Sequence, residues 1–383
     1  MSTSASLSLT RAGRRIAALA AEQLPTQRLV EEIAEELRGA MSVDALLMAA
    51  ADPDTLLALG AGVVRGMPHT VCAPFWEYEF EVPDFNKFSD LARGSRQVAD
   101  LHAATGGRPE RSARWRELRT LMDADAELRA TFNAGGRGWG FLHLNRGGAA
   151  RGFSDEEVAF VERIAPVVGR ALRLSLISHP AATAGARGPG MAIIDAANRL
   201  VSATPEAVAW FDDLESVYRI HDPVFGVDVP SEVTVAAQEA RARAAADPGA
   251  AATRTRARTR SGVWLLIHAS CLRGAGGSGA DAAVVIEPAR ASEVATLIVD
   301  AYELTPREVD VTRALARGLT TNEIAGELHL SRYTVQDHLK SVYEKAGVSS
   351  RGELVAKMFA DHHHDGLVEA VSRAGGAPVT AAA

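Results

Sequence analysis

Apolar and polar residues alternate with a period of two in the stretch FWEYEFEV. Trp76, Tyr78, Phe80 and Val82 fall on one side of an extended chain there, and three glutamates fall on the other. This period is typical of a half-buried β-strand, so we expect a strand with an aromatic face. The stretch GRGWGFLHL, residues 136–144, predicts another strand.

The period becomes helical in FSDEEVAFVERIAPVVGRALRLSLI. Ser154 occupies the N-cap position of this stretch, and acidic residues fill the first turn, where they interact favourably with the helix dipole. A long amphipathic helix is therefore predicted. Near the start of the chain, RAGRRIAALAAEQLP has arginines before an apolar run that stops at Glu22, which favours an amphipathic first helix over an export signal.

Two further patterns predict a second sheet. GMAIIDAANRLVSATPEAVAWF indicates a strand, a turn, a strand and then a helix begun by Thr204 and Pro205. TRTRARTRSGVWLLIHASCL indicates a hairpin with its turn at Ser261-Gly262. Alternating arginines on its first strand fit either a basic nucleic-acid arm or the solvated face of an edge strand, and we favour the second: Arg254, Arg256, Arg258 and Arg260.

Segments rich in Pro, Gly and Ala divide the chain. SHPAATAGARGPG, residues 178–190, is typical of a linker, and AGGAPVTAAA is typical of a flexible end. A length of 383 residues suits two or three domains. We expect an α+β multidomain protein with domains at residues 1–178, 188–290 and 298–363 and a flexible tail at 366–383.

Composition narrows the class of protein. Two cysteines, Cys72 and Cys271, match no metal spacing and suit a reducing cytosol. No apolar run approaches the roughly 20 residues needed to span a bilayer, so we expect a cytoplasmic protein without membrane contact. The net charge of −7 implies that any nucleic-acid role is confined to a small surface, because phosphate neutralisation requires cations.

Local signals for four short helices fill the third domain. Thr305, Pro306 and Glu308 form a capping box with proline at the first helical position, and Gly318 supplies a left-handed stop. Thr320 with Glu323 marks a second start. Its apolar face comprises Ile324, Ala325 and Leu328, and the later signals are a turn at His329-Leu330, a cap at Ser331 and a fourth start at Ser350-x-x-Glu353.

The third of these helices has two distinct faces on a helical wheel. Val335, Leu339, Val342 and Ala346 form one apolar stripe. The opposite side is polar and consists of Tyr333, Gln336, Asp337, Lys340 and Glu344. A short helix with a polar outer face, placed just after another short helix, is the layout of a helix-turn-helix whose second helix enters the DNA major groove.

Three resemblances to known families follow. LTPREVDVTRALARGLTTNEIAGELHLSRYTVQDHLKSVYEKAGVSSRGELV closely resembles the LuxR/FixJ-type DNA-binding domain of bacterial transcription regulators. GGRGWGFLHLNR with the helix after it resembles the end of a GAF-type sensor domain, which implies an antiparallel sheet flanked by helices around a small-molecule pocket. Residues 188–290 are similar to a PAS-like sheet.

The LuxR resemblance implies site residues and partners. It implies a four-helix domain that binds double-stranded DNA as a homodimer, with Leu354, Val355, Met358 and Phe359 at the dimer contact. Ser331 and Thr334 would contact phosphate, while His338 fits a phosphate contact or packing equally well. The full predicted DNA-binding set is Thr320, Ser331, Tyr333, Thr334, Gln336, Asp337, His338 and Lys340.

The other candidate ligand, metal and catalytic sites have simpler structural interpretations. Trp76, Tyr78 and Phe80 could line a ligand pocket, although core packing is the commoner role of such a face. His362, His363, His364 and Asp365 lack metal-ligand spacing. No nucleotide-binding, hydrolase or metalloprotease motif occurs, so we expect no enzyme, no cofactor and no metal.

The sequence thus predicts a transcriptional regulator whose N-terminal domains sense a ligand or partner and control a DNA-binding helix-turn-helix, with RNA polymerase as a further partner. The alternative is a sensor or scaffold whose terminal helices serve dimerisation rather than DNA binding.

Overall fold

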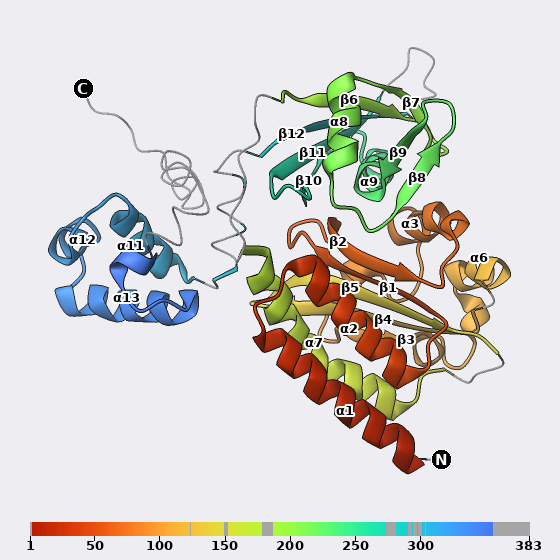
Figure 1. The fold of residues 1–383 in the computed structure, drawn as a ribbon, viewed down its shortest axis with the longest axis horizontal. Helices are drawn as coiled ribbons and strands as arrows, with labels where there is room; N and C mark the ends of the chain where they lie inside the picture. The colour runs from red at the N-terminus through yellow and green to blue at the C-terminus, as the bar shows by residue number, and fades with distance from the viewer. Residues whose placement is uncertain are drawn as a thin grey trace. The chain divides into compact units, whose positions relative to one another are not determined.

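The structure is a computed structural model that describes residues 2–122, 124–148, 152–177, 187–272, 281–289, 293, 297, 301–302 and 304–354. The chain forms two compact units, Met1–Leu176 with Thr183–Pro288, and Ile177–Ala182 with Ala289–Ala383 (Figure 1). No described helix combines the length and apolar character that crossing a bilayer requires. The expected tail at 366–383 and residues 178–186 of the expected linker lie outside the described residues.

The first part of the N-terminal unit is built on an antiparallel five-stranded sheet in the order β2-β1-β5-β4-β3. Its strands are β1 (Ala45–Ala51), β2 (Ala58–Arg65), β3 (Val98–Asp100), β4 (Ala126–Ala134) and β5 (Arg137–Arg146). Its helices are α1 (Ser2–Ala21), α2 (Thr26–Met41), α3 (Cys72–Phe80), α4 (Phe88–Arg93), α5 (Leu101–Ala104), α6 (Ala113–Met122) and α7 (Asp155–Ile177). The predicted strand at 136–144 and the predicted helix capped by Ser154 are confirmed as β5 and α7.

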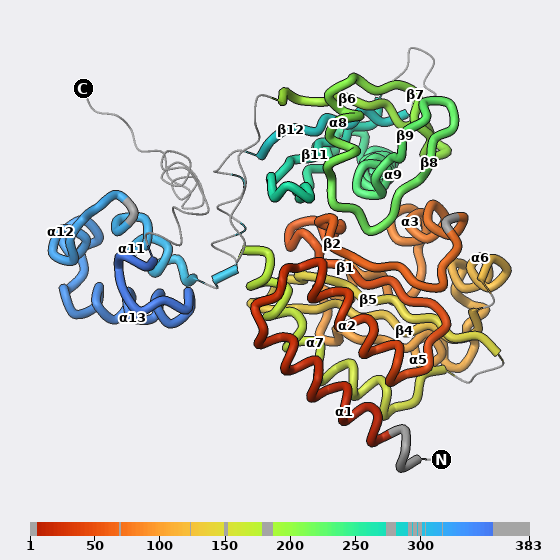
Figure 2. The backbone as a smooth tube through the Cα atoms, viewed as in Figure 1, coloured from red at the N-terminus to blue at the C-terminus, as the bar shows by residue number. Residues whose placement is uncertain are grey.

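Helices α1, α2 and α7 cover the apolar face of this sheet (Figure 2). β4 and β5 direct large apolar side chains to that face, because successive residues of a strand point to opposite sides. Gly140 of β5 allows α7 to approach closely, since a Cβ there would lie 2.5 Å from Leu172 Cδ1. The expected amphipathic first helix is confirmed, with a buried stripe at Leu9, Ala12, Ile16 and Leu19.

The opposite face of the sheet is also buried, and it combines charged side chains with apolar ones such as Leu47 and Phe141, which share a core with Trp76 of α3. Arg129 Nη1 lies 2.9 Å from Glu79 Oε2 of α3, and Arg114 Nη2 of α6 lies 2.6 Å from Glu127 Oε1 of β4. Burial alone would raise the pKa of Glu127, but Arg114 and neighbouring cations hold it at about 2. Burial lowers the pKa of His143 to about 3, so its ring is neutral beside these two pairs.

The predicted strand over FWEYEFEV is wrong, because residues 75–80 belong to the helix α3, and Glu81 and Val82 follow its end. The buried residues of α3 are Cys72, Phe75, Trp76 and Glu79, which follow a helical spacing. The alternation was misleading because it assigned Glu79 to solvent, whereas Glu79 is buried and ion-paired. Trp76, Tyr78 and Phe80 therefore do not share one face of a strand.

The second part of the N-terminal unit contains another antiparallel five-stranded sheet, in the order β10-β11-β12-β6-β7. Counted within its own sheet, this order is the same as in the first: second, first, fifth, fourth, third. Its elements are β6 (Gly190–Ile194), β7 (Leu200–Ala203), α8 (Pro205–Asp213), β10 (Thr253–Arg258), β11 (Trp264–Cys271) and β12 (Ala282–Pro288). A separate hairpin, β8 (Arg219–Asp222) and β9 (Val227–Pro230), precedes α9 (Ser231–Ala246).

The predicted elements of this part are confirmed. Thr204 caps α8 by accepting a hydrogen bond from the Ala207 N–H, and Pro205 is its first residue. The hairpin turns at Ser261-Gly262, where Gly262 has φ +91°. This conformation favours glycine because it has no Cβ.

One hydrophobic core runs through both parts of the N-terminal unit. Nearly all of residues 231–240 of α9 are buried, because this helix contacts α3 of the first part as well as β11 of its own sheet. Gln238 Nε2 of α9 donates to the carbonyl of Ala73, at 3.2 Å. The two N-terminal sheets are therefore packed as a single unit.

Ion pairs between Arg256 and two aspartates, Asp52 and Asp54, also connect the two parts of the N-terminal unit. Arg256 Nη1 lies 3.0 Å from Asp52 Oδ2 and 3.1 Å from Asp54 Oδ2. The Arg256 side chain is only 11% exposed, and that of Asp52 is 1% exposed. The expectation that the arginines of β10 form one solvated face is therefore wrong for Arg256, because the first part of the unit supplies acidic partners that no local pattern reveals.

A buried carboxyl group lies between the two parts. Glu232 of α9 accepts hydrogen bonds from Ser216 Oγ at 2.6 Å and from the Val217 N–H at 3.1 Å. Burial raises the pKa of Glu232 to about 7. A carboxyl group whose pKa is raised by folding contributes stability below about pH 4.5, and this contribution is lost as the pH rises through about 7.

We expect Glu232→Gln to remove this pH-dependent loss of stability. Between pH 5 and 8 the free energy of unfolding of the wild type should fall relative to that of the variant by about 1–3 kcal/mol. Urea unfolding followed by tryptophan fluorescence measures the difference, and the exposed Glu206→Gln provides the matched control. Parallel pH profiles for wild type and Glu232→Gln would contradict the prediction.

Candidate nucleic-acid interface

Three helices with consecutive N-terminal caps lie in the described part of the C-terminal unit: α11 (Pro306–Ala316), α12 (Thr321–Glu327) and α13 (Arg332–Ala346). Thr305 and Thr320 each form the predicted capping box, with Glu308 and Glu323 respectively. Gly318 has φ +90° and ends the first helix as expected. These starts and stops are local, so the sequence alone placed them correctly.

The turn between α12 and α13 is tight. The Leu330 N–H donates to the carbonyl of Ala325 at 2.9 Å, and His329 has φ +52°. Ser331 Oγ then accepts from the Thr334 N–H at 3.0 Å, which starts α13. The turn predicted at His329-Leu330 and the cap predicted at Ser331 are both confirmed.

Helix α13 buries the predicted apolar stripe: Val335, Leu339, Val342 and Ala346. It is also fixed to α11 by a polar contact, because Glu308 Oε2 lies 2.5 Å from Lys345 Nζ and Glu308 Oε1 accepts from Ser341 Oγ at 2.6 Å. Burial by itself would raise the pKa of Glu308, but these donors and Thr305 hold it at about 2. Glu308 therefore orients α13 as well as capping α11, and only the capping role was predicted.

The opposite face of α13 is exposed. Tyr333 is 78% exposed, and the side chains of Gln336, Asp337 and Lys340 are exposed beside it. Ser331 and Thr320 are exposed at their helix starts, whereas Thr334 and His338 are half-buried. Ser331 and Thr320 are engaged as caps, and Thr334 Oγ1 lies 2.8 Å from Ser331 Oγ.

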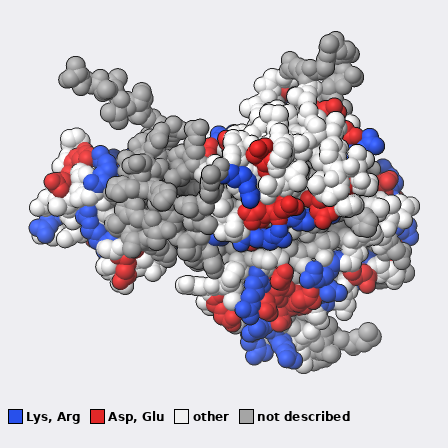
Figure 3. Space-filling model, turned by 45° about the horizontal axis from the view of Figure 1, so that its top comes forward, with Lys and Arg blue, Asp and Glu red and all other residues white. Residues whose placement is uncertain are grey.

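Two cations on this face have no acidic partner within 4.0 Å among the described residues, Arg332 and Lys340. By contrast, Arg307 and Arg313 pair with Asp310, and Arg317 pairs with Glu327. Arg332 was not among the predicted DNA-binding residues, although a cation directly after a helix cap is a recognisable signal for phosphate. On the face shown in Figure 3, Lys and Arg side chains are interspersed with Asp and Glu, so positive charge is local rather than general.

The start of the fourth helix is also in place. The Glu353 N–H donates to Ser350 Oγ at 3.2 Å, and Leu354 is buried. Arg351 donates to the carbonyl of Leu315, in the last turn of α11, and to the carbonyl of Leu319, which follows this helix. The other expected dimer-contact residues, Val355, Met358 and Phe359, lie outside the described residues, as do His362, His363, His364 and Asp365.

Of the predicted ligand-pocket residues, Trp76 and Phe80 line an open cleft and Tyr78 does not. Both cysteines are free thiols, Cys72 buried and Cys271 half-buried. Within the described ranges, His, Cys, Asp and Glu side chains form no group of three or more that could hold a metal ion.

The comparisons with known proteins concern mainly this C-terminal region. The luxR family of bacterial regulatory proteins matches residues 302–358. The chain is 40% identical over 55 residues to the spore germination protein GerE of Bacillus subtilis, a match that covers 14% of this chain and 74% of GerE. It is 50% identical over 52 residues to a protein of Mycobacterium tuberculosis named as an HTH-type transcriptional regulator, covering 14% of this chain and 6% of that relative.

A solved structure matches a larger share of the chain at lower identity. The GAF domain of a phosphoenolpyruvate-protein phosphotransferase from Coxiella burnetii matches 44% of this chain and 94% of that domain, at 13% identity and a TM-score of 0.31. The chain spans only about 6% of the length of the mycobacterial relative, so the likeness to that protein is confined to one domain. From the match at residues 302–358 and the coverage of GerE, the chain belongs to the luxR family of bacterial regulatory proteins.

Proposed function

We propose that this protein is a sequence-specific DNA-binding transcriptional regulator and that α13 is the helix that enters the major groove. The observation that carries the proposal is the exposed polar face of α13, opposite its buried stripe, with Arg332 and Lys340 bearing no acidic partner among the described residues. A helix held in this way presents its outer side chains to base edges.

Each exposed group suits a particular contact. Gln336 can form two hydrogen bonds with adenine, and Lys340 can donate to guanine. Asp337 can only accept, which suits cytosine N4. Ser331, Arg332 and Thr334 lie at the N-terminus of α13, where the helix dipole favours phosphate.

Dimerisation follows from the small number of cations. Affinity for DNA depends strongly on how many phosphates a protein neutralises, and one copy offers few cations on this face. Two copies on adjacent half-sites combine their contacts. The fourth helix, which begins beside the buried Leu354, is the proposed dimer contact together with Val355, Met358 and Phe359.

The N-terminal unit is the proposed control element. A ligand or partner that prefers one arrangement of this unit would shift how the two DNA-binding domains are held, because a ligand shifts an equilibrium only by its differential affinity. The proposed setting is the cytoplasm, where chromosomal DNA and RNA polymerase are available.

The direct test is a DNA-binding measurement on the full chain. Selection from a random DNA library, followed by fluorescence anisotropy at several salt concentrations, should give a selected sequence that binds more tightly than a scrambled one. Affinity for both should fall as salt rises. Equal affinity for selected and scrambled DNA would reject the proposal.

A substitution on α13 tests the reading helix itself. Lys340→Ala should weaken binding to the selected sequence by about 1–3 kcal/mol, or about 5- to 150-fold, if Lys340 contacts a base. Arg307→Ala, which removes an exposed cation from α11, is the matched control and should have little effect. Unchanged affinity and selectivity for Lys340→Ala would remove Lys340 from the reading set.

The second candidate function is a sensor or scaffold whose C-terminal helices only dimerise. Its supporting observation is the mixture of acidic and basic side chains around α12 and α13, where Arg317 is already paired with Glu327. Analytical ultracentrifugation with and without the C-terminal unit, beside the DNA measurement, separates the two functions. Loss of the dimer together with no DNA binding would favour the scaffold.

A further inference from the structure

An open cleft of about 430 Å³ lies within the N-terminal unit, between its two parts. One wall comes from α3, α4 and the loop before β2, and the other comes from the last turns of α9. This volume falls within the range of small-molecule sites, about 300–1,000 Å³. The lining combines an apolar floor with several charged groups.

The floor of the cleft is aromatic and aliphatic. Trp76 and Phe80 are stacked, with ring centroids 5.6 Å apart and an interplanar angle of 12°. Phe88 and Leu56 complete the apolar lining. A floor of this kind favours a ligand with an apolar body.

The positive charges that line the cleft outweigh the negative ones. Lys87, Arg93 and Arg243 line it, and none of the three has an acidic partner within 4.0 Å among the described residues. Of the acids, Glu79 is neutralised by Arg129 Nη1 at 2.9 Å and accepts from the Phe88 N–H at 2.8 Å.

The remaining acids of the lining are Asp90, which is exposed, and Glu239. Burial raises the pKa of Glu239 more than the nearby Arg243 lowers it, so the Glu239 carboxyl group is less ionised at a given pH than a free one and offsets the charge of Arg243 only in part. The uncompensated charge in the cleft is therefore positive.

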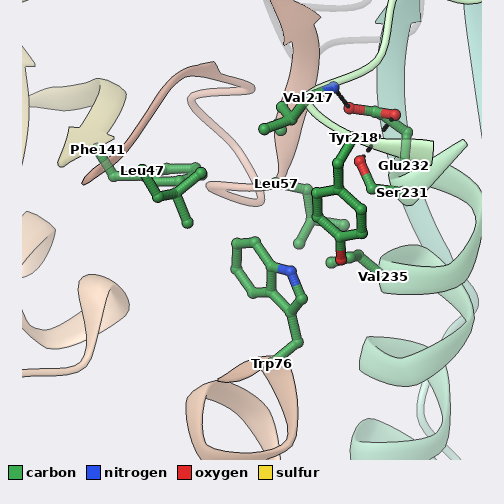
Figure 4. A pocket seen from close by; sticks show the side chains of 10 residues that line it. Leu47, Leu57, Trp76, Phe141, Val217, Tyr218, Ser231, Glu232 and Val235 are labelled. Carbon is green, nitrogen blue, oxygen red and sulfur yellow. Dashed lines mark hydrogen bonds between the residues drawn. The ribbon is translucent and has the colours of Figure 1, made fainter. Parts of the chain in front are cut away.

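Trp76 also borders a second, internal cavity. Figure 4 shows its ring extending from α3 toward Tyr218 and Val235, with Glu232 and Ser231 beyond them. That cavity measures about 10 Å³, which is room for no more than one water molecule. A ligand must therefore be accommodated in the open cleft, with the Trp76 ring as its inner wall.

We propose that this cleft binds a small organic anion with an apolar body, which lies on Trp76 and Phe80 and directs its charged group to Lys87, Arg93 and Arg243. The inference rests on the proposed sensing role and names the chemical class of the ligand. Because Arg243 belongs to α9 and Lys87 precedes α4, the ligand bridges the two parts of the N-terminal unit.

The test uses three probes of one shape and different charge: 2-naphthoate, 2-naphthalenemethanol and 2-naphthylmethylammonium. Titration calorimetry on the full chain should give at least tenfold tighter binding for 2-naphthoate than for either of the other two. Lys87→Gln and Arg243→Gln should each weaken 2-naphthoate binding several-fold and leave the neutral probe unaffected. Glu239→Gln should strengthen 2-naphthoate binding.

The matched control is Arg96→Gln, an exposed arginine outside the cleft, which should leave 2-naphthoate binding unchanged. Equal binding of the three probes, or equal losses in Arg96→Gln and Arg243→Gln, would overturn the proposal. The DNA measurement remains independent of these results. Selective DNA binding without 2-naphthoate binding rejects the ligand site alone, whereas charge-dependent 2-naphthoate binding without DNA binding rejects the regulator function alone.

Discussion

Arg129→Met is expected to destabilise the N-terminal unit by about 3–5 kcal/mol. The Arg129 side chain is fully buried, and its partner Glu79 is 4% exposed. Removing the guanidinium leaves the Glu79 carboxyl buried without its cation, and it also removes the contact of Arg129 with the Phe88 ring, whose centroid lies 4.0 Å from Arg129 Cζ. Loss of one partner of a buried ion pair is costly because the remaining charge is not solvated.

Chemical unfolding followed by tryptophan fluorescence measures this effect selectively, since all five tryptophans precede residue 265 and none belongs to the C-terminal unit. The control is Arg28→Met, which breaks an exposed pair with Glu32 and should cost less than about 1 kcal/mol. The double variant Glu79→Gln/Arg129→Met should be more stable than Arg129→Met alone. A double variant less stable than Arg129→Met would show that the unpaired carboxyl is not the cause.

Arg256→Met is expected to destabilise the same unit by about 2–4 kcal/mol and to separate the unfolding of its two parts. Its side chain joins β10 to Asp52 and Asp54 of the first part. The cost should be below that of Arg129→Met, because Asp52 still accepts from the backbone N–H groups of Asp54 at 2.9 Å and Arg256 at 3.1 Å.

Differential scanning calorimetry provides the measurement, with a broadened or split transition for the N-terminal unit as the expected result. Arg28→Met breaks only an exposed pair with Glu32 of α2, so it should leave the transition nearly unchanged. Equal effects of the two substitutions would contradict a specific role for the Arg256–Asp52 ion pair in connecting the two parts.

The C-terminal unit was predictable because its signals are short-range. The caps at Thr305, Thr320 and Ser331 and the stop at Gly318 depend on residues within three or four positions. The buried stripe of α13 also follows from helix geometry alone. The role of Glu308 in holding Lys345 was not predictable, since the two residues are 37 positions apart.

The N-terminal unit shows where local patterns fail. FWEYEFEV alternates as a strand does, yet its first six residues are helical, and Glu79 is buried in an ion pair with an arginine on a distant strand. Arg256 belongs to an alternating, solvated-looking series, yet Asp52 covers it. A charged side chain is reliably exposed only when no oppositely charged group is available to pair with it inside the fold. The partners of Glu79 and Arg256 are 50 and 204 residues away, so the local sequence does not indicate them.

The sequence by itself determined the α+β class, the helix and strand starts that carry local capping or periodicity signals, and the outward face of α13, because periodicity and capping act over a few residues. Only the tertiary structure decided that the two N-terminal sheets share one core, that α3 is a helix, and that Lys87 and Arg243 line one cleft with Trp76. Burial and ion pairing depend on neighbours in space, and these neighbours are fixed only when the chain has folded.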